Sequence, residues 1–121
     1  MLSANASSSR NRRSPASASN WILFYTGHDG SKDYLDSDTI KKIGAARRVW
    51  TKNIPKMPDK GGVASVVYYA EIDCDAATFR PLDGTQYDAR GLPVLSSPIE
   101  MTALRIYPDS MGEALMQDVC D

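Results

Sequence analysis

Apolar and polar residues alternate with a period of two over much of the chain, the pattern typical of β-strands. Residues 21–26 are apolar on both faces and β-prone, so we expect a central strand there. A turn at 27–31 and a short return strand at 33–35 would complete a hairpin. The alternation predicts further strands at 45–53, at 63–74, over 78–82 together with 85–87, and at 102–106.

Turn-forming residues separate these segments. Ser37 or Asp38 is expected to cap a single helical turn that ends at Gly44. Residues 54–62 contain two Pro and two Gly and predict a loop, and residues 88–91 predict a tight turn. Pro93 and Pro98 restrict the segment that follows to a sheet edge or to short pieces.

The C-terminal segment changes period and predicts a helix. Ser110 and Glu113 have the spacing of a capping box, in which each side chain satisfies a free backbone N–H. Behind this start, one apolar stripe at helical spacing contains Leu115, Met116, Val119 and Cys120. These patterns together predict a small α+β domain whose helix packs on a sheet.

The two cysteines are both expected to face the core, because Cys74 ends the more apolar face of residues 63–74 and Cys120 lies in the helix stripe. We predict a disulfide between them, which in the chain-entropy model would stabilise the fold by roughly 4 kcal/mol. The alternative is two free, buried thiols in a reducing compartment. A zinc site is disfavoured because the chain has one histidine and no further cysteine.

The composition bounds the size and class of the protein. With 121 residues, 42% of them hydrophobic, the chain suits one compact domain. Its apolar stretches are much shorter than a membrane-spanning helix requires, so no membrane span is expected. Residues 1–20 are rich in Ser, Ala, Asn and Arg and predict a disordered tail before a domain at 21–121. No secretory signal peptide is visible in this tail.

Charge is segregated along the chain although the net charge is -1, which does not favour nucleic acid as a partner. Residues 39–62 hold seven Lys or Arg and one Asp, a local charge of +6, whereas residues 63–121 hold three basic and ten acidic residues. Such a basic segment could bind a polyanion such as a sulphated glycan, or it could be a solvated strand and loop. The candidate partner-binding residues are Lys41, Lys42, Arg47, Arg48 and Lys52.

The sequence contains no recognisable catalytic set, cofactor motif or metal site. His28 could serve as a base, but its neighbours Gly27 and Asp29 favour a turn residue. The aspartates at 29, 33, 36 and 38 do not follow the spacing of a calcium loop, so turn and capping roles are preferred. Several aromatic residues could line a ligand surface or form cross-strand packing pairs: Trp50, Tyr68, Tyr69, Tyr87 and Tyr107.

An ordered series of residues from about 21 to 120 resembles the surface-adhesin protein E family of bacterial envelope proteins. The series consists of Trp21, Tyr34-x-Asp36, Ile40, Gly44, Val49-Trp50, Asp73-Cys74, Arg80-x-Leu82, Tyr87, Gly91, Pro108-x-Ser110 and Val119-Cys120. The resemblance implies a six-stranded, mostly antiparallel sheet with a C-terminal helix that a Cys74–Cys120 disulfide ties to one face. The resemblance does not identify any binding residue in this sequence.

The resemblance also implies a function. We expect a non-enzymatic binding module that is periplasmic, outer-membrane-associated or secreted and binds a host extracellular-matrix protein or a polyanionic glycan. One alternative is a structural or assembly protein of the envelope that forms a homodimer through a sheet face or edge. Another is a small-molecule carrier, which would need a deep apolar cavity between sheet and helix.

Overall fold

A computed structural model describes residues 20–94 and 102–120 of the chain. Its strands are β1 (Trp21–Thr26), β2 (Lys32–Asp36), β3 (Lys41–Ile43), β4 (Ala46–Ile54), β5 (Ser65–Asp73), β6 (Thr78–Tyr87) and β7 (Leu104–Arg105). A 3₁₀ turn, η2 (Ser37–Thr39), precedes β3, and helix α1 (Met111–Val119) follows β7. The expectations for residues 1–19 and for Pro98 lie outside the described residues.

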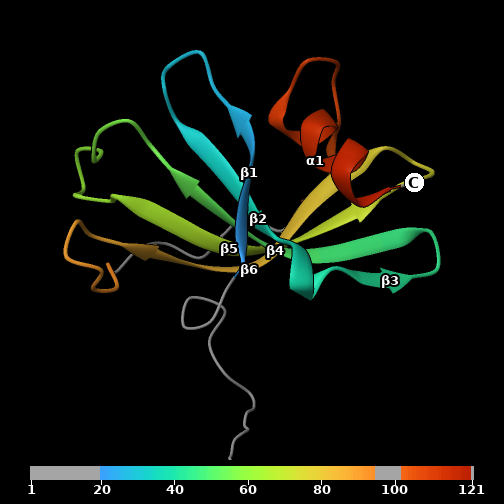
Figure 1. Cartoon of the computed structure of the whole chain (residues 1–121), viewed down its shortest axis with the longest axis horizontal. Helices are drawn as coiled ribbons and strands as arrows, with labels where there is room; N and C mark the ends of the chain where they lie inside the picture. The colour runs from blue at the N-terminus through green and yellow to red at the C-terminus, as the bar shows by residue number, and fades with distance from the viewer. Residues whose placement is uncertain (1–19, 95–101, 121) are drawn as a thin grey trace, which may run out of the picture.

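The strands form one antiparallel sheet in the order β1-β2-β4-β5-β6-β7, and β3 pairs with β4 beside this path. Figure 1 shows the strands as a twisted fan with α1 above them and β3 near their lower border. The predicted antiparallel α+β fold is confirmed. The short strand β3 adds a seventh strand to the six that were expected.

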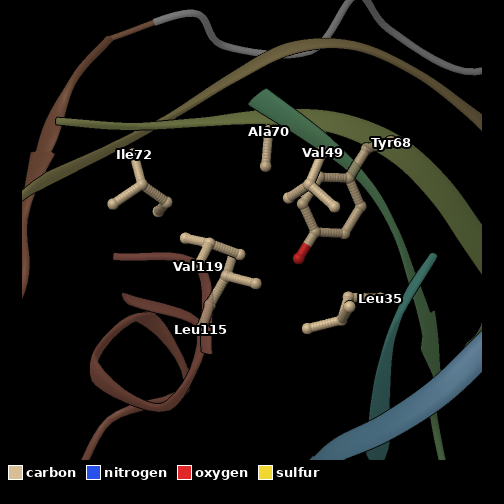
Figure 2. Packing of buried hydrophobic residues seen from close by; sticks show 7 residues of the cluster. All are labelled: Leu35, Val49, Tyr68, Ala70, Ile72, Leu115 and Val119. Atoms are coloured by element: carbon tan, nitrogen blue, oxygen red, sulfur yellow. The ribbon is translucent and has the colours of Figure 1, made fainter. Parts of the chain in front are cut away.

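The core lies between the sheet and α1. On β5, Tyr68, Ala70 and Ile72 project to one side and are buried in a cluster that includes Leu115 and Val119 of the helix. Figure 2 shows the two helix side chains directed toward those of the strands. Burial of a large aliphatic side chain stabilises a fold by about 1.5–3 kcal/mol, so this contact explains why the helix stays on the sheet. The apolar face predicted for residues 63–74 is the one that α1 covers.

The start and end of α1 are both fixed by named contacts. The Ser110 hydroxyl accepts a hydrogen bond from the Glu113 N–H at 3.2 Å, and the Glu113 carboxylate accepts one from the Asp109 N–H at 2.9 Å. At the other end, Cys120 forms a disulfide with Cys74, with the two Cα atoms 5.9 Å apart. The predicted capping residues and the predicted disulfide are therefore confirmed, and the free-thiol alternative is wrong.

The structure corrects the placement of residues 21–26. They form a strand, but β1 is at the edge of the sheet rather than at its centre, and Ile22 and Leu23 are 45% and 47% exposed. The pairing of β1 with β2 shifts register between Leu23 and Tyr25, and Phe24 packs against the core. Apolar residues on both faces therefore reflect an irregular edge strand that lies against α1, not a strand with neighbours on both sides.

The helical turn expected between residue 37 and Gly44 is also shorter and differently capped. Asp36 is the cap, since its carboxylate accepts a hydrogen bond from the Asp38 N–H at 3.1 Å. The turn ends at Thr39 because Lys41–Ile43 pair as a strand with β4. Gly44 instead occupies the turn between β3 and β4, where its φ of 58° is costly for most other residues.

Candidate binding surface

The face of the sheet opposite α1 collects aromatic and basic side chains. Successive residues of a strand point to opposite faces, so Arg48, Trp50 and Lys52 of β4 lie on the face that Val49 and Thr51 do not. Directly paired residues on adjacent antiparallel strands share a face. The register therefore places on this helix-free face the pairs Tyr34 with Lys52, Trp50 with Tyr69, Arg48 with Glu71, and Glu71 with Arg80.

Trp50 and Tyr69 form the centre of this face. Their ring centroids are 4.9 Å apart with planes inclined at 32°. Beside them is a hollow of about 300 Å³, lined by Asp38, Thr39, Ile40, Lys41, Trp50 and Tyr69. The sheet thus supplies an aromatic floor, and the segment from η2 to the start of β3 supplies the wall.

A hydroxyl group holds that wall against the sheet. The Thr39 hydroxyl donates a hydrogen bond to the Asp36 carbonyl at 2.8 Å and accepts one from the Trp50 N–H at 3.0 Å. A side chain therefore takes the place of a strand neighbour for the Trp50 N–H. This contact fixes the turn next to the aromatic pair, so the hollow is a consequence of how η2 joins β4.

An ion ladder crosses the sheet next to the aromatic pair. Glu71 on β5 lies between Arg48 and Arg80, and each guanidinium is 2.9 Å from one of its carboxylate oxygens. Hydrogen bonds from Arg80 and then Arg48 lower the pKa of Glu71, against an opposing effect of partial burial. Because a single carboxylate faces two arginines, the ladder retains a net positive charge.

Two further cations lie on β3, the strand beside the hollow. Lys41 and Lys42 are exposed and pair in register with Arg48 and Arg47, so Lys41 shares the helix-free face with Arg48 and Lys42 shares the opposite face with Arg47. Neither lysine forms an ion pair with any residue of 20–94 or 102–120. Lys52 lies elsewhere on the helix-free face, with its ammonium group 5.6 Å from the centre of the Trp21 ring.

Arg47 differs from the other candidate residues. It is 8% exposed and lies on the sheet face that α1 covers, where its guanidinium donates to the carbonyls of Gly44 and Ala46. Strand alternation places Arg47 and Arg48 on opposite faces, and the structure identifies which of the two is inside. We therefore leave Arg47 and its register partner Lys42 out of the candidate surface. The partner-binding role of Lys41, Arg48 and Lys52 stays a prediction.

The aromatic residues divide in the same way. Tyr68 is buried in the core, with its ring edge-on to that of Phe79, so it is a packing residue. Trp50 and Tyr69 form a cross-strand pair and also line the hollow, so both interpretations apply to them. The sequence did not predict that Asp38 and Ile40 line a hollow, because no local pattern indicates that a turn will fold against an aromatic pair.

The acidic cluster and His28 have structural roles. His28 lies exposed in the turn between β1 and β2, where the Asp29 carboxylate accepts a hydrogen bond from the Ser31 N–H at 3.0 Å. Asp33 is buried and accepts a hydrogen bond from the Asn53 side chain. Burial raises the pKa of Asp33. Within the described part of the chain, no three potential ligands gather as a metal site would require.

A second hollow lies on the side of the sheet that faces α1. It measures about 270 Å³ and is lined by Val66, Tyr68, Phe79, Pro81 and Met111. Its walls are apolar side chains from β5, β6 and the first residue of the helix. The carrier alternative requires a ligand in such a place, and it stays a prediction.

A protein-family model described as surface-adhesin protein E matches residues 21–121. The chain belongs to the surface-adhesin protein E family. Membership supports macromolecular binding, a non-enzymatic role and a location at the bacterial surface or envelope. In the described residues, no helix is long and apolar enough to span a membrane. A comparison with curated protein sequences returned no significant match.

Solved structures of Haemophilus influenzae protein E have the same fold as this family member. The selenomethionine form of protein E aligns with a TM-score of 0.63 and 19% identity, covering 83% of this chain and 84% of that chain. Crystal form II aligns with a TM-score of 0.63 and 17% identity, covering 92% and 96% respectively. Protein E from the non-typeable organism aligns with a TM-score of 0.58 and 16% identity, covering 93% and 85%.

Proposed function

We propose that this protein is a non-enzymatic binding module of the bacterial envelope that binds an anionic macromolecular partner through its helix-free sheet face. One observation carries the proposal. Lys41 is exposed on that face without an ion-pair partner in residues 20–94 and 102–120, next to a net-positive arginine ladder. Cations that have no internal partner keep their full charge for an external one.

A polyanionic glycan is the partner that these features favour over a host extracellular-matrix protein. The cations lie near an aromatic pair and a hollow of small-molecule size, which suits one unit of a charged polymer, whereas a stable protein interface buries about 800 Å² on each partner. A protein partner would instead show binding that resists high salt, since apolar contacts are not screened. The salt dependence therefore separates the two classes of partner.

The disulfide supports an oxidising compartment. A Cys74–Cys120 bond forms and persists in an oxidising environment, which in bacteria means the periplasm or the exterior. We therefore propose a periplasmic, outer-membrane-associated or secreted location.

Neutralising the lysines of the helix-free face tests the proposal. The double variant Lys41→Gln, Lys52→Gln should bind immobilised heparin, used as the probe, at least about tenfold more weakly than the wild type. Binding is measured by surface plasmon resonance at several ionic strengths. The loss should be largest at low salt, where screening is weakest.

A matched variant controls for net charge alone. The double variant Lys56→Gln, Lys60→Gln also removes two lysines but leaves the helix-free face intact. It should bind heparin within about twofold of the wild type. Equal binding by the wild type and the first double variant would reject the role of the basic segment.

A second function is favoured by the edge strand β1. Among the described residues β1 pairs only with β2, and it exposes Ile22 and Leu23. An unprotected apolar edge is a template for pairing with another strand. The structural alternative is an envelope assembly protein that forms a homodimer through this edge.

A further inference from the structure

The hollow next to Trp50 and Tyr69 has the chemistry of a sugar-binding subsite. The Trp50 and Tyr69 rings stack on one another, with centroids 4.9 Å apart and planes inclined at 32°, so each ring keeps one outer face that is flat and apolar. The C–H groups on one face of a pyranose ring form a matching apolar surface, which loses less on leaving water than the hydroxyl edge does. A phosphate or carboxylate chain has no such face.

The wall of the hollow contains both a hydrogen-bond acceptor and a hydrogen-bond donor. Asp38 provides a carboxylate, which accepts hydrogen bonds from hydroxyls, and Lys41 provides an ammonium group, which donates them. Within the described residues, neither side chain has a hydrogen bond or ion pair to another group. Both are therefore available to a ligand that has hydroxyls as well as negative charge.

The size of the hollow limits the ligand. Its volume of about 300 Å³ is at the lower end of small-molecule sites, which span roughly 300–1,000 Å³. This space suits a single monosaccharide unit. The rest of a polymer would extend over the sheet, where Arg48 lies beside Lys41 in register.

We propose that this hollow binds one pyranose ring of an acidic glycan. The ring stacks on Trp50, a hydroxyl hydrogen-bonds to Asp38, and the anionic substituent faces Lys41 and Arg48. The inference rests on the proposed function, which supplies the polyanion, and adds that recognition depends on the sugar ring as well as on charge.

Two probes of similar charge separate ring recognition from charge attraction: a sulphated heparin hexasaccharide and a short inorganic polyphosphate. In a full-length Trp21→Phe background, Trp50 is the single remaining tryptophan and reports on the hollow by fluorescence. The hexasaccharide should shift Trp50 emission and the polyphosphate should not. Trp50→Leu should weaken hexasaccharide binding about tenfold and change polyphosphate binding less than about twofold, as measured by calorimetry.

The control for Trp50→Leu is Tyr107→Leu, which removes an exposed aromatic residue outside the hollow and should leave both affinities within about twofold. Thermal unfolding verifies that each variant is folded. Asp38→Asn, at an exposed turn, gives a second test. It removes the same repulsive charge from both probes but removes a charged hydroxyl acceptor from the hexasaccharide alone, so hexasaccharide binding should fall relative to polyphosphate binding.

The outcomes distinguish the two proposals. If both probes bind through the lysines but Trp50→Leu and Asp38→Asn affect them equally, the sugar subsite is wrong and the proposed function stands. If neither probe binds the wild type, the proposed function is wrong, and the subsite falls with it. Selective loss of the hexasaccharide in Trp50→Leu, with the polyphosphate retained, supports the subsite.

Discussion

Glu71 shows how a single residue organises the surface. It holds two arginines from neighbouring strands at 2.9 Å each, and so keeps their charges on the helix-free face. The side chains of Arg48 and Arg80 are 37% and 40% exposed, and solvent weakens ion pairs of this kind. The ladder is therefore expected to position charge more than to stabilise the fold.

Glu71→Gln tests this at the residue scale. The pKa of Glu71 is lowered in the folded state, so its contribution is present above the unfolded pKa and is lost as pH falls through the folded one. At pH 7 the variant should be less stable than the wild type by under about 1 kcal/mol, and near pH 3 the difference should shrink. Urea denaturation at the two pH values measures both.

Asp75→Asn is the matched control for that experiment, because Asp75 is exposed and has no ion pair within the described residues. Asp75→Asn should have the same unfolding free energy as the wild type at both pH values. A Glu71→Gln difference that grows as pH falls would contradict the assignment of the arginines as the dominant partners.

At the scale of elements, α1 depends on contacts far away in the sequence. The helix has nine residues, which is too short to be stable alone in water. Leu115 and Val119 pack it on the sheet, and Cys120 bonds it to the end of β5 through a disulfide whose partners are 46 positions apart. Packing and cross-link therefore act at the same place.

Removal of the disulfide should destabilise the whole fold. The double variant Cys74→Ala, Cys120→Ala should lose about 4 kcal/mol of unfolding free energy, because its unfolded chain regains the entropy of the opened loop. Urea denaturation of the oxidised wild type and the variant measures the loss. The wild type in reductant should resemble the variant, whereas an unchanged midpoint after reduction would show that packing alone holds the helix.

At the scale of the whole molecule, two features govern what the protein can bind. Positive charge is concentrated in residues 39–62 and negative charge in residues 63–121, so one part of the surface attracts anions while the net charge is -1. The edge strand β1 offers a separate, apolar contact. The binding proposal uses the first feature, and the assembly alternative uses the second.

The assembly alternative predicts a dimer that Leu23→Lys dissociates. A stable dimer through β1 should bury more than about 1,000 Å², and a charge placed on the exposed edge should oppose it. Sedimentation velocity over a range of concentrations measures the association. Lys32→Ala on β2, next to the edge, serves as the control and should leave the mass unchanged. A monomeric wild type at every concentration would reject the alternative.

Some elements could be predicted from the sequence and others could not. The strand at Ala46–Ile54 and the helix start at Ser110 could be predicted because alternation and capping are local properties. The edge position of β1 could not be predicted, since an apolar strand has the same sequence pattern whether it has one neighbouring strand or two. The hollow could not either, because its floor and wall meet only through the Thr39 contact with Trp50.

The sequence by itself determined the main strands, the capped C-terminal helix, the cysteine pair and the separation of charge, because each depends on residue type and short-range spacing. The tertiary structure alone decided which face of β4 lies inside. That choice buries Arg47 and leaves Arg48 and Trp50 on the helix-free face, where Trp50 meets Tyr69. The physical reason is that strand alternation sorts residues into two faces, and where both faces of a strand carry polar residues, only long-range packing determines which face is inside.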